Sequence, residues 1–301
     1  MKIKISVVMA TYNGAKYLQQ QLDSILIAQS LQIDELIIVD DCSSDETTKI
    51  LNQYDNDPRV TVILNRENQG VVKSFEAAMK NSGGDFIFFS DQDDVWHKDK
   101  VRKLIDIIGD NLLMHSDARL ISANGSIIES SFSRHKNLQL NRFIDFLIGN
   151  IVTGCTMVCS RELLDFVLPF PAGIMMHDHY LAICASFFNR LGYCNEVLTD
   201  YRQHDENIMG GFGVTYNKLR QYHQKQAEQL SSMLLHSQIS ACQSNAIMMA
   251  IDYHCSIAYS KPPALATLYW YFKHFRLKRT IGFMLRGSLG ERVAKIFYKM
   301  R

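Results

Sequence analysis

The sequence predicts an α/β protein with a doubly wound, mainly parallel sheet, helices on both faces of that sheet, and a helical C-terminal extension. Apolar runs rich in β-branched residues alternate with segments of helical period through the first 90 residues, as in proteins with a parallel sheet. Acidic or polar side chains follow several of these runs directly. The chain has 301 residues and is 47% hydrophobic, so it can form a core that covers such a sheet.

Four strands and three helices are expected in the first 90 residues, in alternation. Each strand is an apolar run that stops at a turn or at acidic residues, and the runs are 3–10, 35–39, 60–64 and 85–90. The helices expected between them cover 17–26, 43–54 and 70–82. Ser43 and Glu46 have the spacing of a capping box and should begin the second helix. Neither the glycine-rich dinucleotide fingerprint nor a P-loop motif follows the first strand.

After residue 90 the alternation is less regular. The expected elements are a helix at 98–108, a strand at 112–115, a hairpin at 117–128, a short helix at 142–148, a β-rich run at 151–160, a helix at 177–188 and a strand at 193–198. Asn124-Gly125 is the turn signal of the hairpin. From 215 to 259 the sequence reads as helix, and a basic aromatic tail follows the break at Pro262-Pro263. A boundary near 212 therefore separates the α/β part from a helical region at 213–301.

The acidic loop after the fourth strand is the most informative segment. Asp91, Asp93 and Asp94 place three carboxylates in four positions, and these repel one another unless a cation or another partner joins them. Because hard cations prefer oxygen ligands and bridge protein to phosphate, the loop predicts a Mg²⁺ or Mn²⁺ site. A polar turn that caps the next helix is the alternative reading.

Polar side chains also follow the first and second strands. They are Thr11 and Asn13 after the first strand, and Asp40 and Asp41 after the second. Open α/β sheets bind ligands beyond the carboxyl ends of their strands. We therefore expect these side chains to converge with the acidic loop at one edge of one sheet.

Charge and cysteine content narrow the classes of binding partner and the compartment that are expected for this chain. The net charge of +1 gives no overall field for nucleic acid, but residues 269–301 carry nine Lys or Arg and only Glu291 as an acid. Such a basic aromatic segment fits a surface for anionic phosphates or lipid head groups, or an ordinary solvated helix face.

The seven cysteines form no CxxC pair, which favours buried thiols in a reducing compartment. No signal-type apolar core opens the chain, and the longest apolar stretch, near 146–160, is too short for a membrane span. A soluble or peripheral protein is expected.

Six motifs occur in order along the chain. They are SVVMATYNG at 6–14, IIVDDCSSDET at 37–47, NQG at 68–70, FFSDQDDVW at 88–96, HD at 177–178 and YRQHDEN at 201–207. With these motifs the chain resembles the inverting glycosyltransferase family 2, which has the GT-A fold, over about residues 3–211. The DQDDVW, HD and YRQH variants look most like the bacterial rhamnosyltransferases that build cell-surface polysaccharide.

The resemblance implies roles for individual residues. In the family, the position matching Asp91 contacts the ribose side of the donor, and the one matching Asp93 binds the metal. His204 matches a histidine that completes the metal site. Asp94 is a weaker candidate for a metal ligand. Asp178 matches the catalytic base, although the start of a helix also suits a capping carboxylate. The donor-binding candidates are Thr11, Asn13, Asp40, Asp41, Asn68, Lys73, Asp91 and Arg202. The acceptor-binding candidates are Trp96, Thr153, Gly154 and His177.

The implied activity is metal-dependent, inverting sugar transfer from a nucleotide-diphosphate donor. The preferred donor is dTDP-rhamnose, and the expected acceptor is a glycan or a lipid-linked oligosaccharide. The resemblance places residues 1–212 as a catalytic domain, with a nucleotide-binding half at about 1–110 and an acceptor half at about 111–212. The expected location is the cytoplasm, with the inner-membrane surface as a partner of the C-terminal region. The alternatives are a non-catalytic sugar-nucleotide or glycan-binding module and a nucleotidyltransferase, for which Thr-Tyr-Asn-Gly-Ala after the first strand is unsuited.

Overall fold

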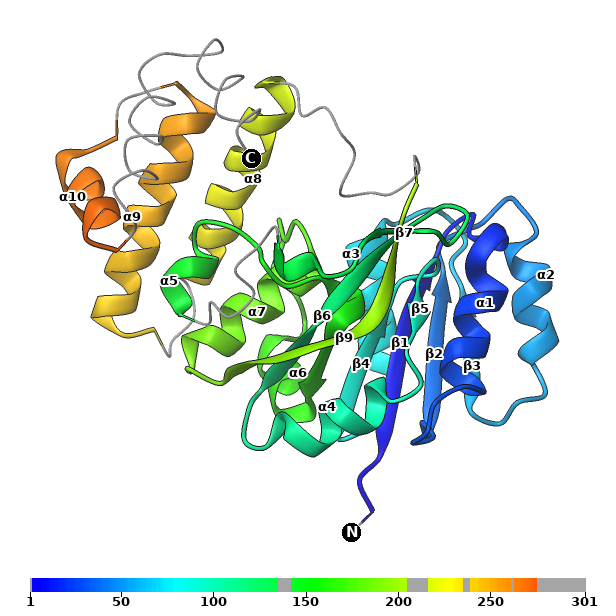
Figure 1. The fold of residues 1–301 in the computed structure, drawn as a ribbon. Coiled ribbons are helices and arrows are strands. Elements are labelled where there is room, and N and C mark those ends of the chain that lie inside the picture. Colours follow the sequence, from blue (N-terminus) through cyan, green and yellow to red (C-terminus); the bar gives the residue numbers. More distant parts are fainter. Residues whose placement is uncertain (1, 135–141, 205–215, 235–238, 261–262, 275–301) are drawn as a thin grey trace. The chain divides into compact units, whose positions relative to one another are not determined.

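The computed structural model describes residues 2–134, 142–204, 216–234, 239–260 and 263–274 (Figure 1). The chain forms two compact units. The first comprises Met1–Phe170 and Met176–Asn207, and the second comprises Pro171–Met175 and Ile208–Arg301. The predicted boundary between 212 and 213 lies outside the described residues and stays a prediction.

The first part of the sheet follows the predicted alternation. Its strands are β1 (Ile5–Thr11), β2 (Glu35–Asp40), β3 (Val60–Leu64) and β4 (Phe86–Ser90). They lie in the order β3-β2-β1-β4, and every neighbouring pair is parallel. The helices between them are α1 (Ala15–Leu26), α2 (Thr47–Leu51) and α3 (Val71–Asn81). The carboxyl ends of β1, β2 and β4 therefore meet at one edge, as predicted.

The second part makes the sheet mixed. Its strands are β5 (Val95–Trp96), β6 (Leu113–Ser122), β7 (Ile127–Glu129), β8 (Met157–Ser160) and β9 (Leu191–Gln203). The order continues β4-β8-β6-β9-β5, with β7 paired to β6, and β8 runs antiparallel to both of its neighbours. The helices of this part are α4 (Lys100–Ile108), α5 (Phe143–Phe146), α6 (Arg161–Val167) and α7 (His177–Phe187). Because β8 is beside β4, the segment before β8 reaches the acidic loop.

Helices cover both faces of the sheet, and successive residues of β4 show this. Phe88 lies in a core cluster with residues of α1 and α4 and contacts Trp96 with ring centroids 5.8 Å apart. Phe89 points to the opposite face, where it contacts Phe75 of α3 and His177 of α7. Alternation of side chains along a strand explains why both positions are apolar.

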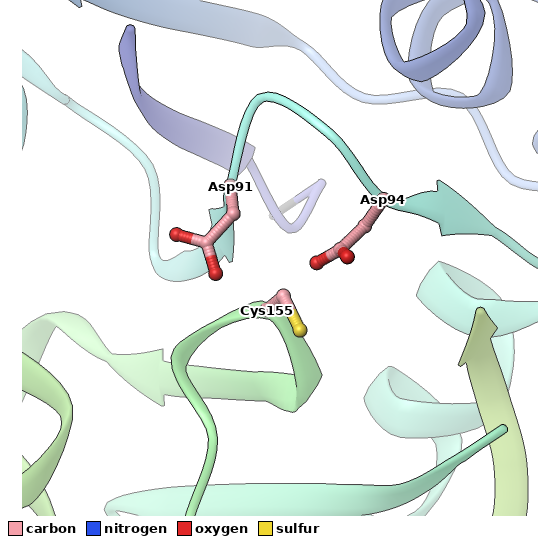
Figure 2. Close-up of side chains that lie close together, drawn as sticks. All are labelled: Asp91, Asp94 and Cys155. Carbon is pink, nitrogen blue, oxygen red and sulfur yellow. The ribbon is translucent and has the colours of Figure 1, made fainter. Parts of the chain in front are cut away.

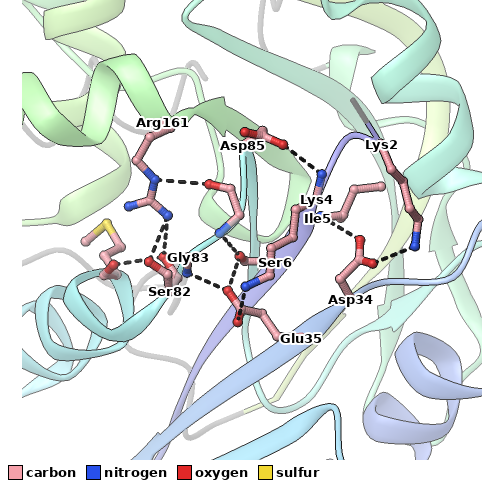
Figure 3. A network of polar contacts seen from close by, with 12 residues as sticks. Lys2, Lys4, Ile5, Ser6, Asp34, Glu35, Ser82, Gly83, Asp85 and Arg161 are labelled. Atoms are coloured by element: carbon pink, nitrogen blue, oxygen red, sulfur yellow. Dashed lines mark hydrogen bonds and ion pairs between the residues drawn. The ribbon is translucent and has the colours of Figure 1, made fainter.

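A polar network fixes the opposite edge of the sheet, where the strands begin (Figure 3). The Ser6 hydroxyl donates to Glu35 at 2.6 Å, and the Gly84 amide donates to the Ser6 hydroxyl at 2.8 Å. The Lys4 amide donates to the Asp85 carboxylate at 2.8 Å. A Cβ at position 84 would lie 2.3 Å from the Ser6 Oγ, so this close approach requires glycine. The network links the starts of β1, β2 and β4 and fixes their register.

Three local predictions need correction. The capping box is wrong, because the Ser43 hydroxyl donates to Asp40 at 2.6 Å and α2 begins only at Thr47. The hairpin around Asn124-Gly125 is confirmed, but its first arm and the strand predicted at 112–115 are one strand, β6. The β-rich run at 151–160 is a strand only from Met157, since a 3₁₀ turn at Gly154–Thr156 precedes it.

From residue 216 on, the described part of the second unit is mainly helical. Its helices are α8 (Tyr216–Met233), α9 (Ala241–Ala258) and α10 (Leu265–His274), so the helix predicted at 215–259 is divided in two. His223 and His254 join α8 and α9 through a 2.7 Å contact between their Nδ1 atoms. Within the described residues, every helix is too short or too polar to cross a membrane. Most of the predicted basic tail, from residue 275 on, lies outside the described residues.

Candidate active site

The acidic loop connects β4 to β5 and is held against the loop that follows β1. The Gln92 side chain accepts a hydrogen bond from the Tyr12 amide at 2.8 Å and donates to the Tyr12 carbonyl at 3.0 Å. Gly14 leaves space for this contact, because a Cβ there would lie 2.2 Å from Gln92 Oε1. Sequence reasoning missed Gln92, since an amide between acidic residues reads as a solvated side chain.

Asp93 and His204 form a nearly buried pair at the centre of the site. The Asp93 Oδ2 and His204 Nε2 atoms are 2.8 Å apart, and their side chains are 12% and 11% exposed. His204 directly follows β9, whereas Asp93 lies in the loop before β5, and these two strands are paired. The structure thus brings together the two residues that the sequence analysis named as metal ligands.

Arg202 braces the acidic loop. Its backbone amide donates to Asp94 Oδ1 at 2.9 Å, and its Nε donates to the Asp93 carbonyl at 2.7 Å. The guanidinium also donates to Gln20 at 2.8 Å and lies over the Tyr17 ring, 4.6 Å from its centroid. Arg202 is only 2% exposed. Because its donors are engaged by the protein, we leave it out of the donor contacts proposed below.

Asp91 and Asp94 approach Cys155, which lies in the turn before β8 (Figure 2). One ligand atom of each residue lies within 4.8 Å of the other two. Burial, followed by the charge of Asp93, raises the pKa of Asp94 to about 7. Burial, followed by the charge of Asp94, raises the pKa of Asp91. Asp94 Oδ2 is buried and accepts from no nitrogen or hydroxyl donor among the described residues, with only the weak Cys155 thiol beside the carboxylate, so the acidic loop fits a cation chemically.

Lys100 is a fully buried cation beneath this group. Its Nζ donates to the carbonyl of Cys155 and lies 3.7 Å from the centroid of the Trp96 ring. Burial lowers the pKa of Lys100 to about 7. A lysine at the start of an amphipathic helix normally reads as solvent-facing, so sequence reasoning missed it, as it missed Cys155. The contacts of both Lys100 and Cys155 depend on β8 lying beside β4.

Trp96 lies in the core and not on an open surface. Its side chain is 2% exposed and is covered by Lys100 and by Phe88. A sugar would need an uncovered ring face for stacking. Trp96 therefore takes no part in the acceptor site that we propose.

Asp178 lies in the first turn of α7, 8% exposed, against the turn before β8. Its Oδ2 accepts from the Gly154 amide at 3.2 Å, and its Oδ1 accepts from the His179 amide at 2.6 Å. The charge of Asp178 also contributes to the raised pKa of Asp91. The two carboxylates are therefore close, although 87 residues separate them in the sequence. The neighbouring Thr153 is half-buried, and its carbonyl accepts from the Thr156 amide at 2.9 Å.

His177 lies between aromatic rings beside Asp178. Its ring centroid is 3.9 Å from that of Phe75 and 5.6 Å from that of Phe89. Neither ring nitrogen has a hydrogen-bond partner in the described part of the chain, and burial lowers the pKa of His177 to about 3. The imidazole is therefore neutral. A Cβ on Gly154 would lie 3.1 Å from its Nε2, which explains the glycine.

The remaining donor candidates surround the ends of β1 and β2. Asp40 accepts from the Thr11 hydroxyl at 2.8 Å and from the Ser43 amide at 2.9 Å. Asn13 adopts a left-handed conformation (φ 49°), and its side-chain oxygen accepts from the Ser44 amide at 2.8 Å. These contacts shape the loops after the two strands.

Asp41 fixes the start of α3. It accepts from the Gln69 and Gly70 amides, each at 2.8 Å. Burial acts to raise the pKa of Asp41, but these amides and Asn65 outweigh it, so the pKa is lowered. Asn68 and Lys73, beside this contact, are exposed.

Comparison with solved structures identifies the fold first. TarS 1-349 of Staphylococcus aureus in complex with UDP-GlcNAc matches with a TM-score of 0.62 and 21% identity, over 98% of this chain and 84% of that one. The mannosyltransferase PcManGT from Pyrobaculum calidifontis, in complex with GDP-Man and Mn²⁺, matches with a TM-score of 0.60 and 15% identity, over 100% and 80%. The fold is that of a GT-A glycosyltransferase.

The family follows from the sequence. The model of glycosyl transferase family 2 matches residues 6–168, more than half of the chain. The dTDP-rhamnosyl transferase RfbG of Shigella flexneri is 32% identical over 232 residues, which are 70% of this chain and 78% of RfbG. The chain belongs to glycosyl transferase family 2.

Proposed function

We propose that this protein is a metal-dependent, inverting glycosyltransferase that moves a sugar from a nucleotide-diphosphate donor to a glycan or lipid-linked acceptor in bacterial cell-surface polysaccharide synthesis. The similarity to RfbG supports dTDP-rhamnose as the first donor to test. TarS, a poly(ribitol-phosphate) β-N-acetylglucosaminyltransferase, supports a polymer as the acceptor class. The observation that carries the proposal is the Asp93–His204 pair, which lies at the same sheet edge as Asp91 and Asp178.

The metal is held by Asp93 and His204 in this proposal, as Mg²⁺ or Mn²⁺. Asp93 and His204 offer an oxygen and a nitrogen ligand atom 2.8 Å apart, and PcManGT provides an example of Mn²⁺ on the same fold. When bound, the cation neutralises charge on the departing diphosphate as a Lewis acid. Asp91 contacts the ribose side of the donor, from the first position of the acidic loop.

Asp178 acts as the general base. It takes the proton of the acceptor hydroxyl while that oxygen bonds to the glycosyl carbon, and the bond from this carbon to the β-phosphate oxygen breaks on the opposite side. The amides of Gly154 and His179 hold the carboxylate in place. The acceptor then lies against Thr153 and Gly154, and the neutral His177, buried against Phe75, packs behind them.

The donor lies along the carboxyl ends of β1 and β2. Thr11, Asn13 and Asp40 form the polar floor for its base and ribose, and Asp41 holds the start of α3 in position. Asn68 and Lys73 are exposed beside that start, so an amide and a cation are available to the diphosphate or the base.

Donor binding tests this proposal. Titration with dTDP-rhamnose, UDP-GlcNAc and GDP-mannose, in Mg²⁺, Mn²⁺ or EDTA, should show metal-dependent binding of one donor. Asp93→Asn should abolish that binding, whereas Asp106→Asn, which alters an Asp with a 61% exposed side chain on α4, should not change it. Binding of no donor, or binding unaffected by metal and by Asp93, would contradict the proposal. Binding without transfer to any acceptor would indicate a non-catalytic module.

We also propose a peripheral position on the cytoplasmic face of the inner membrane. Leu265 and Tyr269 are 84% and 69% exposed, Lys273 is exposed, and a spacing of four residues places all three on one face of α10. An apolar stripe next to basic residues suits an anionic lipid surface. Co-sedimentation of the full chain with anionic vesicles should be lost in the Leu265→Ser/Tyr269→Ser variant. Equal sedimentation of this variant and the wild type would contradict the proposal.

A further inference from the structure

The carboxylates of the acidic loop point in two directions. Asp93 contacts His204, whereas Asp91 and Asp94 lie on the two arms of the loop and face Cys155 (Figure 2). We infer that Asp91, Asp94 and Cys155 form a second cation site, separate from the Asp93–His204 pair and selective for a thiophilic divalent cation such as Zn²⁺.

A poorly paired buried oxygen in this group is the strongest support for the inference. Asp94 is completely buried. Its Oδ1 accepts from the Arg202 amide at 2.9 Å, whereas its Oδ2 accepts from no nitrogen or hydroxyl donor among the described residues and has only the Cys155 thiol, a weak donor, beside the carboxylate. A buried carboxylate oxygen with so weak a partner is unfavourable. Lys100, a cation buried in the same region, donates instead to the Cys155 carbonyl. A cation between the two carboxylates and the thiol would supply a strong partner.

The ligand set determines which cation fits. Mg²⁺ takes oxygen ligands in octahedral geometry, whereas Zn²⁺ accepts one sulfur and two oxygens in a tetrahedral site. Tetrahedral Zn²⁺ needs ligand atoms about 3.5 Å apart, and the three atoms here lie within 4.8 Å of one another. Side-chain rotation therefore has to close the group by about 1 Å. On binding, the sulfur–metal bond replaces the S–H bond, and the thiol proton passes to solvent.

Occupancy of this site has a consequence for catalysis. Asp91 is the residue that we place against the donor ribose, so a bound Zn²⁺ would withdraw it and inhibit transfer even when Mg²⁺ is saturating. This consequence rests on the proposed function. Cation binding itself does not, since it requires only the three side chains.

Cobalt provides an optical probe of the site. The full chain, freed of metal with EDTA, is titrated with Co²⁺, and the sulfur-to-cobalt charge-transfer absorption is recorded. We expect a one-equivalent band that excess Mg²⁺ leaves in place and Zn²⁺ removes. The band should be lost in Cys155→Ser and in Asp94→Asn. It should persist in Cys159→Ser, which alters another buried thiol, and in Cys42→Ser, which alters an exposed one.

Competition between Zn²⁺ and Co²⁺ gives the Zn²⁺ affinity of each variant, and thus how much each side chain contributes to binding. Loss of a residue that only supports a ligand weakens metal affinity about 10- to 100-fold, so Cys155→Ser should weaken Zn²⁺ binding at least about tenfold. Circular dichroism checks that each variant is folded. A missing band in the folded wild type, a band that survives Cys155→Ser, or displacement of Co²⁺ by equimolar Mg²⁺ would overturn the inference. Because the band is recorded without donor or acceptor, these results stand even if the chain transfers no sugar.

Discussion

Replacing the buried Lys100 by methionine should stabilise the first unit while impairing the site. Methionine keeps the length of the side chain and removes its charge. In the folded protein, burial lowers the pKa of Lys100 from 10.5 to about 7. The protonated side chain is therefore disfavoured by folding at neutral pH.

The magnitude follows from proton linkage. With a pKa of about 7 folded and 10.5 unfolded, the ammonium costs about 4 kcal/mol of stability at pH 7 and about 2 kcal/mol at pH 9. Because the pKa of Lys100 is lower in the folded protein than in the unfolded one, the protonated side chain destabilises the fold. This cost in stability is complete below pH 7 and disappears as the pH rises through 10.5. Methionine removes this cost but also the hydrogen bond to Cys155 and the contact with Trp96, together worth about 2 kcal/mol. The net gain in unfolding free energy is about 2 kcal/mol at pH 7 and close to zero at pH 9.

Urea unfolding measures this difference. The chain has two tryptophans, Trp96 and Trp270, so a Trp270→Phe background makes Trp96 fluorescence report the first unit alone. Lys103→Met is the matched control, because Lys103 lies on the same helix with its side chain 33% exposed and pairs with Glu196. A surface pair contributes about 0–1 kcal/mol, without a pH slope between 7 and 9. A loss of stability in Lys100→Met at pH 7, or an equal gain at both pH values, would refute the reasoning. Transfer activity should fall, because the Cys155 carbonyl loses the contact that fixes the turn beside Asp178.

Three further substitutions test individual contacts of the site. Asp178→Asn should lower kcat about 10²- to 10⁴-fold, as loss of a general base does, with unchanged donor affinity in calorimetry; an unchanged kcat would exclude the base role. Gly154→Ala should lower the free energy of unfolding by about 1–3 kcal/mol through overpacking, and it should displace the base and lower transfer activity. Gly149→Ala is the control, because a Cβ at position 149 would lie in open space. It should change neither thermal unfolding nor transfer activity. His204→Ala should weaken Mn²⁺ binding at least about tenfold by titration, since loss of a residue that only supports a ligand already has that effect. His97→Ala, from another His–Asp pair, should have no effect; equal losses would show a general effect of removing such pairs.

The sequence was most informative where the backbone alone determines position. Parallel strands bring their carboxyl ends together whatever the side chains, so Thr11, Asp40 and the acidic loop could be placed at one edge before any contact was known. The Asp93–His204 pair needed the resemblance as well, because only the pairing of β5 with β9 joins positions 111 residues apart. Trp96 shows the limit of prediction from the sequence. Its burial depends on packing with Lys100, and neither residue type indicates that contact.

The acidic loop also explains why motif spacing could not define the ligand sets. Asp93 and Asp94 are adjacent, yet one contacts His204 and the other accepts from the Arg202 amide, because the chain bends at Gln92 and Asp93 before β5 begins. A cation that uses all three carboxylates would have to turn one of these two residues around and break its contact. The carboxylates instead divide into the pair with His204 and the group with Cys155. A spacing of two residues therefore predicts a shared side for Asp91 and Asp93, whereas the curvature of the loop places Asp91 with Asp94.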